Sequence, residues 1–194
     1  HSATSVALLR ILVGQQVTFT PLTVAPTDAL NHFDGVLLIA DEALHGLQDG
    51  LAPVHTDLGE RWRRLTGLPM VFAVWAARRD VTSARQLALL TSLLEEAQMR
   101  FTAAPDTVVD AASKRFPFPP EYIRGYFARL GYGFGPDEQA GLRRFLELAT
   151  DAGELDEVPT LHRPNGGGFA VSGETVGVSS TPDERRGDTG ADDA

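Results

Sequence analysis

A nearly unbroken apolar run over residues 68–77 places the strongest constraint on how this chain folds. The run follows a short segment rich in charged residues, and together residues 57–76 read DLGERWRRLTGLPMVFAVWA. Gly67 separates the two parts, and glycine is the commonest residue just after a helix. A continuous apolar run is typical of a strand that is buried on both faces of a sheet. The pattern predicts a helix over residues 58–66 and a long buried strand over residues 68–77.

Three aromatic residues of this central unit are predicted to lie in the core. They are Trp62 on the helix and Phe72 and Trp75 in the strand. Large aromatic side chains in such segments are most often buried, because they carry much apolar surface.

The segments before this unit alternate between helical and extended patterns. Residues 2–13 predict an amphipathic helix that begins at Ser2 or Thr4 and ends at Gly14. Short strands or extended segments are predicted over residues 17–20, 35–40 and 53–56, with brief helices over residues 27–30 and 41–47. This alternation predicts an α/β lobe with a mostly parallel sheet.

After Ser83 the pattern becomes helical. Apolar residues recur at helical spacing in Leu87, Leu90, Leu94, Ala97 and Phe101. Further helices are predicted after the Pro119-Pro120 pair and from Gly135 to Gly153. Residues 159–194 are rich in Gly, Ser, Thr and acidic residues, and we expect them to be disordered because they offer too little apolar surface to offset the entropy of ordering.

Composition narrows the classes of function. The net charge of −9 and the pI near 4.9 argue against a nucleic-acid surface, which needs clustered Lys and Arg. No apolar run approaches the length of a membrane span and no signal-peptide pattern is visible, so we expect a cytoplasmic protein. The chain has no Cys, and its five His show no metal-ligand spacing, so we expect no metal site.

Four motifs in this order carry a resemblance to a known family. Besides the central unit they are SATSVAL at residues 2–8, IADEAL at residues 39–44 and YFARLGY at residues 126–132. The chain resembles the menaquinone-biosynthesis family of the futalosine route over residues 1 to about 155. The first motif of this chain corresponds to a position that follows the opening part of the family pattern. The resemblance therefore implies an N-terminally truncated chain.

The resemblance implies a periplasmic-binding-protein-like fold of type II, an α/β architecture with two lobes and the ligand between them. Residues 1–68 would form the inserted α/β lobe. Residues 69–158 would supply the crossover strand and the helices that complete the first lobe, whose opening strands would be absent. Residues 159–194 would follow as the disordered tail.

The activity implied by the resemblance is that of a carbon–oxygen lyase, a hydro-lyase that converts chorismate to 3-[(1-carboxyvinyl)oxy]benzoate without a cofactor. A small carboxylate would then be the partner, and the oligomeric state stays open. Two alternatives remain: a non-catalytic binding module of the same fold for a carboxylate solute, and an inactive fragment of the enzyme.

The first helix start is one candidate substrate site. Ser2, Thr4 and Ser5 lie where unpaired N–H groups meet hydroxyl donors. They could cradle a substrate carboxylate or simply cap the helix. The residues alone favour the cap, and the resemblance favours the cradle.

The other candidate site residues flank the predicted strands. Asp41 could orient a substrate hydroxyl, help to move a proton or cap the next helix, and it is the one candidate for a catalytic role. Ala40 stands where the family usually has a glycine, so its methyl group would narrow the pocket or alter a turn. Leu68 and Pro69 would touch ligand where the strand leaves the inserted lobe. The catalytic base is not identified.

Overall fold

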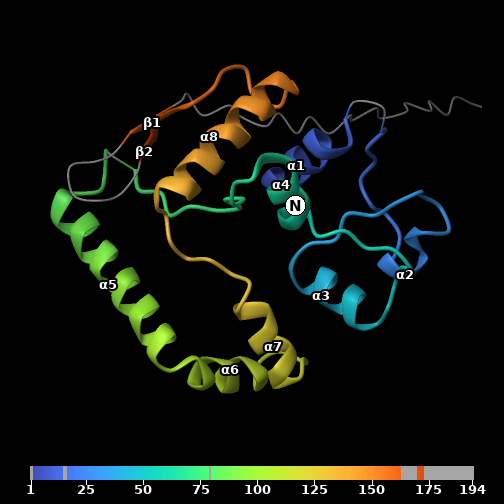
Figure 1. The fold of residues 1–194 in the computed structure, drawn as a ribbon, viewed down its shortest axis with the longest axis horizontal. Coiled ribbons are helices and arrows are strands. Elements are labelled where there is room, and N and C mark those ends of the chain that lie inside the picture. The colour runs from blue at the N-terminus through green and yellow to red at the C-terminus, as the bar shows by residue number, and fades with distance from the viewer. Residues whose placement is uncertain (1, 15–16, 79, 163–169, 173–194) are drawn as a thin grey trace, which may run out of the picture.

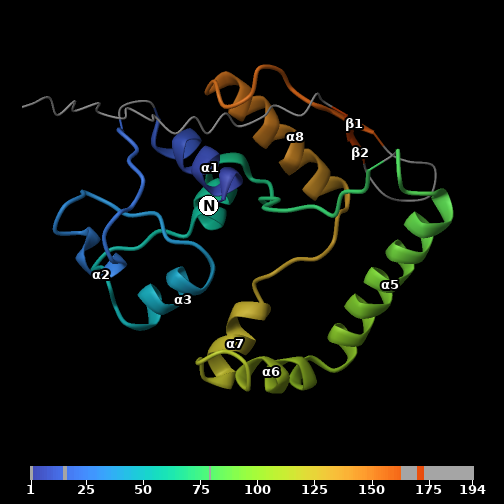
Figure 2. The same ribbon diagram turned by 180° about the vertical axis from the view of Figure 1, so that it is seen from behind.

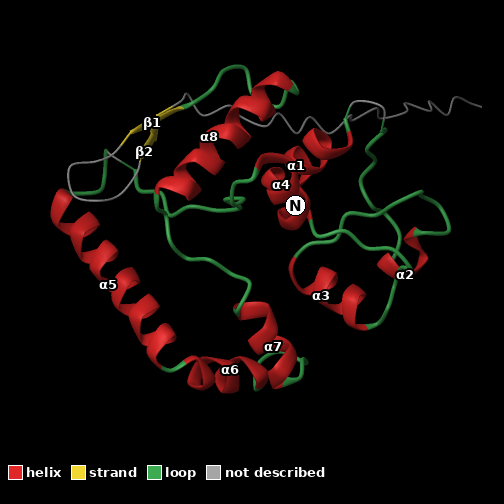
Figure 3. Cartoon of the chain, in the orientation of Figure 1, coloured by secondary structure: helices red, strands yellow, loops and turns green. Residues whose placement is uncertain are grey.

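The computed structural model describes residues 2–14, 17–78, 80–162 and 170–172. Within them the chain is mostly helical (Figures 1 and 3). The helices are α1 (Ala3–Val13), α2 (Pro26–Ala29), α3 (Ala40–Gln48), α4 (Leu58–Thr66), α5 (Ala84–Ala103), α6 (Pro105–Ser113), α7 (Pro120–Phe127) and α8 (Pro136–Asp151). Two short antiparallel strands follow, β1 (Thr160–His162) and β2 (Ala170–Ser172), with Leu161 opposite Val171. None of the described helices is both long enough and apolar enough to cross a membrane.

Helix α4 confirms the boundaries predicted from the sequence. It begins after Asp57, whose carboxylate accepts hydrogen bonds from the N–H groups of Gly59 at 2.8 Å and Glu60 at 3.0 Å. It ends at Gly67, which has a φ of +74°. This left-handed conformation is costly for residues with a Cβ, so glycine is the natural stop here.

One hydrophobic cluster joins α1, α4 and α8. Its buried members are Ala7, Leu8, Trp62 and Phe145. The indole of Trp62 and the ring of Phe145 meet edge to face, with centroids 6.1 Å apart. Burial of these apolar side chains is the main force that holds the three helices together, and the prediction that Trp62 lies in the core is confirmed.

A second cluster holds α6 and α7 together and receives α3. Its buried members are Val109, Phe118 and Ile123. The Tyr122 hydroxyl donates a hydrogen bond to the carbonyl oxygen of Leu44 at 3.1 Å, which attaches α3 to α7. In Figures 1 and 2 this cluster lies below the group formed by α1, α4 and α8.

The strands predicted over residues 17–20, 35–40, 53–56 and 68–77 are wrong as secondary structure. Among the described residues the only paired strands are β1 and β2. The side chains of Phe72, Val74 and Trp75 are 47%, 46% and 75% exposed, so Phe72 and Trp75 are not core residues here. An apolar run shows that a segment can be buried, but a strand forms only where a neighbour pairs with its backbone.

The long helix α5 packs less than its sequence pattern predicts. None of its residues is buried. Within the predicted apolar stripe, Phe101 contacts the rings of Phe127 and Tyr132, whereas Leu90 remains 37% exposed. Leu87 and Leu94 are half-buried as Phe101 is, whereas Leu90 and Ala97 are exposed, so the stripe is covered only in part.

The predicted domain organisation stays a prediction. The cluster around Trp62 contains residues from both sides of the proposed boundary at residue 68. Residues 160–162 and 170–172 lie in the segment that was predicted to be disordered, yet they form the two paired strands. The reason is that hydrogen bonds between strands supply backbone partners, and composition does not reveal such pairing. Residues 163–169 and 173–194 lie outside the described residues.

Candidate functional site

The start of α1 has the geometry of a serine cap with an additional hydroxyl beside it. Ser2 precedes the helix, and its Oγ accepts a hydrogen bond from the N–H of Ser5 at 3.3 Å. The Oγ atoms of Ser2 and Ser5 lie 3.0 Å apart, and Ser5 is buried. The structure therefore assigns the cap to Ser2 rather than Thr4.

Thr4 differs from its two neighbours. Thr4 is half-buried, and its hydroxyl makes no hydrogen bond to another described residue. The N–H groups of Ala3 and Thr4 have no acceptor within the helix, because they belong to its first turn. This end of α1 thus offers a hydroxyl and backbone N–H groups, which suit an anionic ligand.

The start of α3 is built on an unusual backbone conformation. Ala40 has a φ of +52°, and it is the one described residue other than glycine with a positive φ. Ile39 precedes the helix and gives no side-chain cap, while Asp41 lies in the first turn. The alternative that Asp41 caps this helix is therefore wrong. Its exposed carboxylate makes no hydrogen bond or ion pair with another described residue, and its charge favours the positive end of the helix dipole.

Residues 68 and 69 are held between α4 and α8. The Leu68 N–H donates to the Thr66 hydroxyl at 3.1 Å, and the indole N–H of Trp62 donates to the carbonyl oxygen of Pro69 at 3.3 Å. On the other side, a Cβ added to Gly141 would lie 2.1 Å from that same oxygen. This segment is a well-anchored part of the candidate site.

The seven predicted site residues attach to two different clusters. Helix α1 contributes Ala7 and Leu8 to the cluster around Trp62, and Pro69 attaches to this cluster through its hydrogen bond with the Trp62 indole. Helix α3 attaches to the cluster around Phe118. No hydrogen bond or ion pair between described residues joins the start of α1 to the start of α3. Nor do three His, Cys, Asp or Glu side chains in the described ranges gather closely enough to hold a metal ion.

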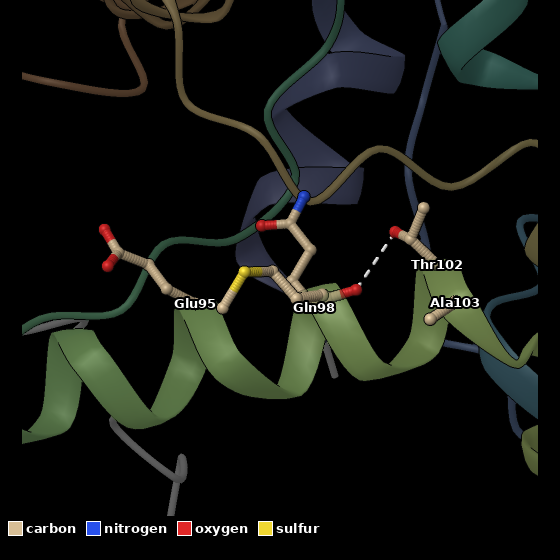
Figure 4. Close-up of a pocket in the computed structure, with 5 residues that line it drawn as sticks. Glu95, Gln98, Thr102 and Ala103 are labelled. Carbon is tan, nitrogen blue, oxygen red and sulfur yellow. Dashed lines mark hydrogen bonds between the residues drawn. The ribbon is translucent and has the colours of Figure 1, made fainter.

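Two shallow hollows lie on the surface of the described structure. The first, of about 560 Å³, runs along one side of α5 and is lined by Glu95, Gln98, Met99, Thr102 and Ala103 (Figure 4). The Thr102 hydroxyl donates to the Gln98 carbonyl oxygen at 3.0 Å. Because all five residues come from one helix, this hollow has a single wall and brings together none of the predicted site residues.

The second hollow, of about 460 Å³, includes the predicted site residue Leu68. The other lining residues all belong to α8 and are Pro136, Gln139, Ala140, Arg143, Arg144 and Glu147. Sequence analysis missed these residues as site candidates. The spacing of Gln139, Arg143 and Glu147 by four residues places them on one helix face, but only the tertiary structure puts that face beside Leu68.

Comparison with known proteins identifies the relatives of this chain. The sequence profile of the family described as "Menaquinone biosynthesis" matches residues 1–151. The chain belongs to the menaquinone biosynthesis family. The family resemblance noted from the four motifs is therefore confirmed. No solved structure matches the chain.

One curated relative of this menaquinone biosynthesis chain is the chorismate dehydratase of Thermus thermophilus. The two sequences are 30% identical over 164 residues, which cover 76% of this chain and 59% of the relative. The chain thus spans less than two thirds of the relative's length. All seven predicted site residues lie within the range that matches the menaquinone biosynthesis family.

Proposed function

We propose that this protein is a chorismate dehydratase of the futalosine route to menaquinone, a hydro-lyase that converts chorismate to 3-[(1-carboxyvinyl)oxy]benzoate. The observation that carries the proposal is the 30% identity to a curated chorismate dehydratase over 164 residues. The start of α1 supports it, because Thr4 and the N–H groups beside it suit a carboxylate.

The reaction defines what the site must do. A base removes the C3 proton of chorismate, the released electron pair forms the new ring double bond, and the C4 hydroxyl leaves and is protonated to water. Both substrate carboxylates must be held, and the charge that builds on the ring carboxylate must be stabilised. Helix-start N–H groups serve this purpose well because they are preorganised and do not titrate.

We assign carboxylate binding to Thr4 together with the first turn of α1. Ser2 and Ser5 support this turn through their mutual contact and the Ser2 cap. Asp41 is the candidate for hydroxyl orientation or proton transfer from this chain, and the substrate's own side-chain carboxylate is the alternative base. Leu68 and Pro69 would contribute the apolar edge of the same cleft.

The proposed fold is the two-lobed, periplasmic-binding-protein-like architecture of type II. The exposure of Phe72, Val74 and Trp75 supports this proposal, because an apolar run of this kind is stable only when a sheet covers it. Residues 68–77, which form no paired strand here, would then be the segment that connects the two lobes, with Leu68 and Pro69 at the cleft edge.

Steady-state kinetics with chorismate test the proposed function. We expect product by chromatography, and we expect Thr4→Val to lower kcat/KM by roughly ten- to a hundredfold, because a hydrogen bond to a charged group is worth about 1.5–3 kcal/mol. Thr91→Val on α5 is the matched control, since the Thr91 hydroxyl donates to the Leu87 carbonyl oxygen within its own helix. The control should leave the kinetics unchanged.

Equilibrium binding of chorismate separates the alternatives. Product formation supports the lyase, and binding without product supports the non-catalytic module. Neither binding nor product would indicate an inactive fragment. Equal kinetic constants for the parent and Thr4→Val would remove Thr4 from the site.

A further inference from the structure

The hollow between Leu68 and α8 combines cationic and apolar walls. Arg143 and Arg144 line it together with Leu68, Pro136 and Ala140. We propose that this hollow, which we call the α8 hollow, binds a small organic carboxylate with an apolar ring. The α8 hollow shares Leu68 with the proposed chorismate cleft but contains none of the residues at the starts of α1 and α3, and it goes beyond the proposed function.

The charges that face the α8 hollow favour an anion. Arg143 makes no ion pair or hydrogen bond with another described residue. Arg144 donates through Nη1 to the Glu147 carboxylate at 3.1 Å. Two guanidinium groups against one carboxylate leave the hollow positive, although the whole chain carries a net charge of −9. A guanidinium presents a planar pair of N–H donors that matches a carboxylate.

The apolar wall is held in place by backbone contacts. The Pro69 carbonyl oxygen accepts from the Trp62 indole and lies against Gly141, so Leu68 is fixed beside α8. Figures 1 and 2 show the segment after α4 running beside α8. A wall that is already in position lowers the entropic cost of binding.

The dimensions of the α8 hollow suit a single ring. Its volume of about 460 Å³ falls within the range of sites for small molecules. Leu68, Pro136 and Ala140 can contact an apolar ring, while Arg143 and Arg144 can meet its carboxylate. The amide of Gln139 donates to the Phe134 carbonyl oxygen at 3.0 Å, so it serves to fix the helix start.

Benzoate is the probe that tests this proposal. An NMR titration measures its binding to the whole 194-residue chain. We expect benzoate to bind and benzamide, which has the same ring without the charge, to bind about tenfold more weakly. Acetate, which has the charge without the ring, should also bind more weakly than benzoate.

Paired variants locate the binding. Arg143→Gln with Arg144→Gln should weaken benzoate binding about tenfold or more, whereas Arg61→Gln with Arg63→Gln on α4 removes the same charge outside the α8 hollow and should leave it unchanged. Glu147→Gln should strengthen binding severalfold, because it releases Arg144.

Three results would overturn the proposal: no benzoate binding by the parent chain at millimolar concentration, equal losses in the two arginine pairs, or weaker binding in Glu147→Gln. If benzoate bound at the start of α1 instead, Thr4→Val would weaken its binding and the two arginine pairs would show equal effects. A failure of the α8 hollow is therefore distinguishable from a failure of the proposed lyase activity, which depends on Thr4.

Discussion

The Pro69 carbonyl oxygen lies 2.1 Å from the position that a Cβ would occupy on Gly141. Two backbones thus meet at a point where no side chain fits. The same oxygen accepts a hydrogen bond from the indole N–H of Trp62 at 3.3 Å, so one carbonyl group connects α4, the segment that follows α4, and α8.

Gly141→Ala should lower the free energy of unfolding by roughly 2–3 kcal/mol, because the new methyl group must displace backbone rather than a flexible side chain. Urea unfolding followed by circular dichroism measures the change. Gly125→Ala is the matched control in α7, where a Cβ would meet nothing within 4 Å. The control should be stabilising by about 0.5–1 kcal/mol. Equal effects of the two substitutions would contradict the close approach.

Ala40→Gly should raise the free energy of unfolding by up to about 1 kcal/mol. The φ of +52° at Ala40 strains a residue with a Cβ by about 1–2 kcal/mol, and the greater freedom of glycine in the unfolded chain offsets part of the relief. Thermal and urea unfolding of the two proteins provide the comparison. Ala43→Gly, farther along α3, is the control and should be destabilising. A loss of stability in Ala40→Gly would show that the left-handed conformation is not populated.

Ser2→Ala should lower the free energy of unfolding by about 1 kcal/mol, because the Ser2 hydroxyl accepts the Ser5 N–H and no other described side chain caps this helix. Thr4→Val should change it by less than about 0.5 kcal/mol, since no hydrogen bond to a described residue is lost. Melting curves of both variants test the distinction. A larger loss of stability in Thr4→Val than in Ser2→Ala would show that Thr4, and not Ser2, caps the helix.

Tyr132 should ionise later than an ordinary tyrosine. Partial burial raises the pKa of Tyr132 above its usual value of 10.0, and the nearby Tyr126 raises the pKa further. Because the pKa of Tyr132 is higher in the folded chain, the unfolded chain loses this proton first as the pH rises. The ionisation of Tyr132 therefore does not affect stability below pH 10.0, and it lowers the free energy of unfolding as the pH rises from there through the pKa of the folded state. The difference between the alkaline absorbance titrations of the parent and Tyr132→Phe should have its midpoint above pH 10.0. A midpoint at or below pH 10.0 would contradict the raised pKa of Tyr132.

The sequence by itself determined the local elements of this protein. The bounds of α4 and its stop at Gly67 follow from the residue pattern and a glycine that accepts a positive φ. These features depend on hydrogen bonds between residues three or four positions apart, so nearby sequence is sufficient. The burial of Trp62 follows from its large apolar surface, and the four motifs identified the family.

Tertiary structure decided how these elements meet. Residues 68–77 have the composition of a buried strand, yet Phe72 and Trp75 are exposed because no described strand pairs with this segment. Ser2, rather than Thr4 or Asp41, proved to be a side-chain cap, and Leu68 came to lie beside Arg143 on a helix far along the chain. Strand pairing and hollows depend on contacts between distant residues, which a local sequence pattern does not specify.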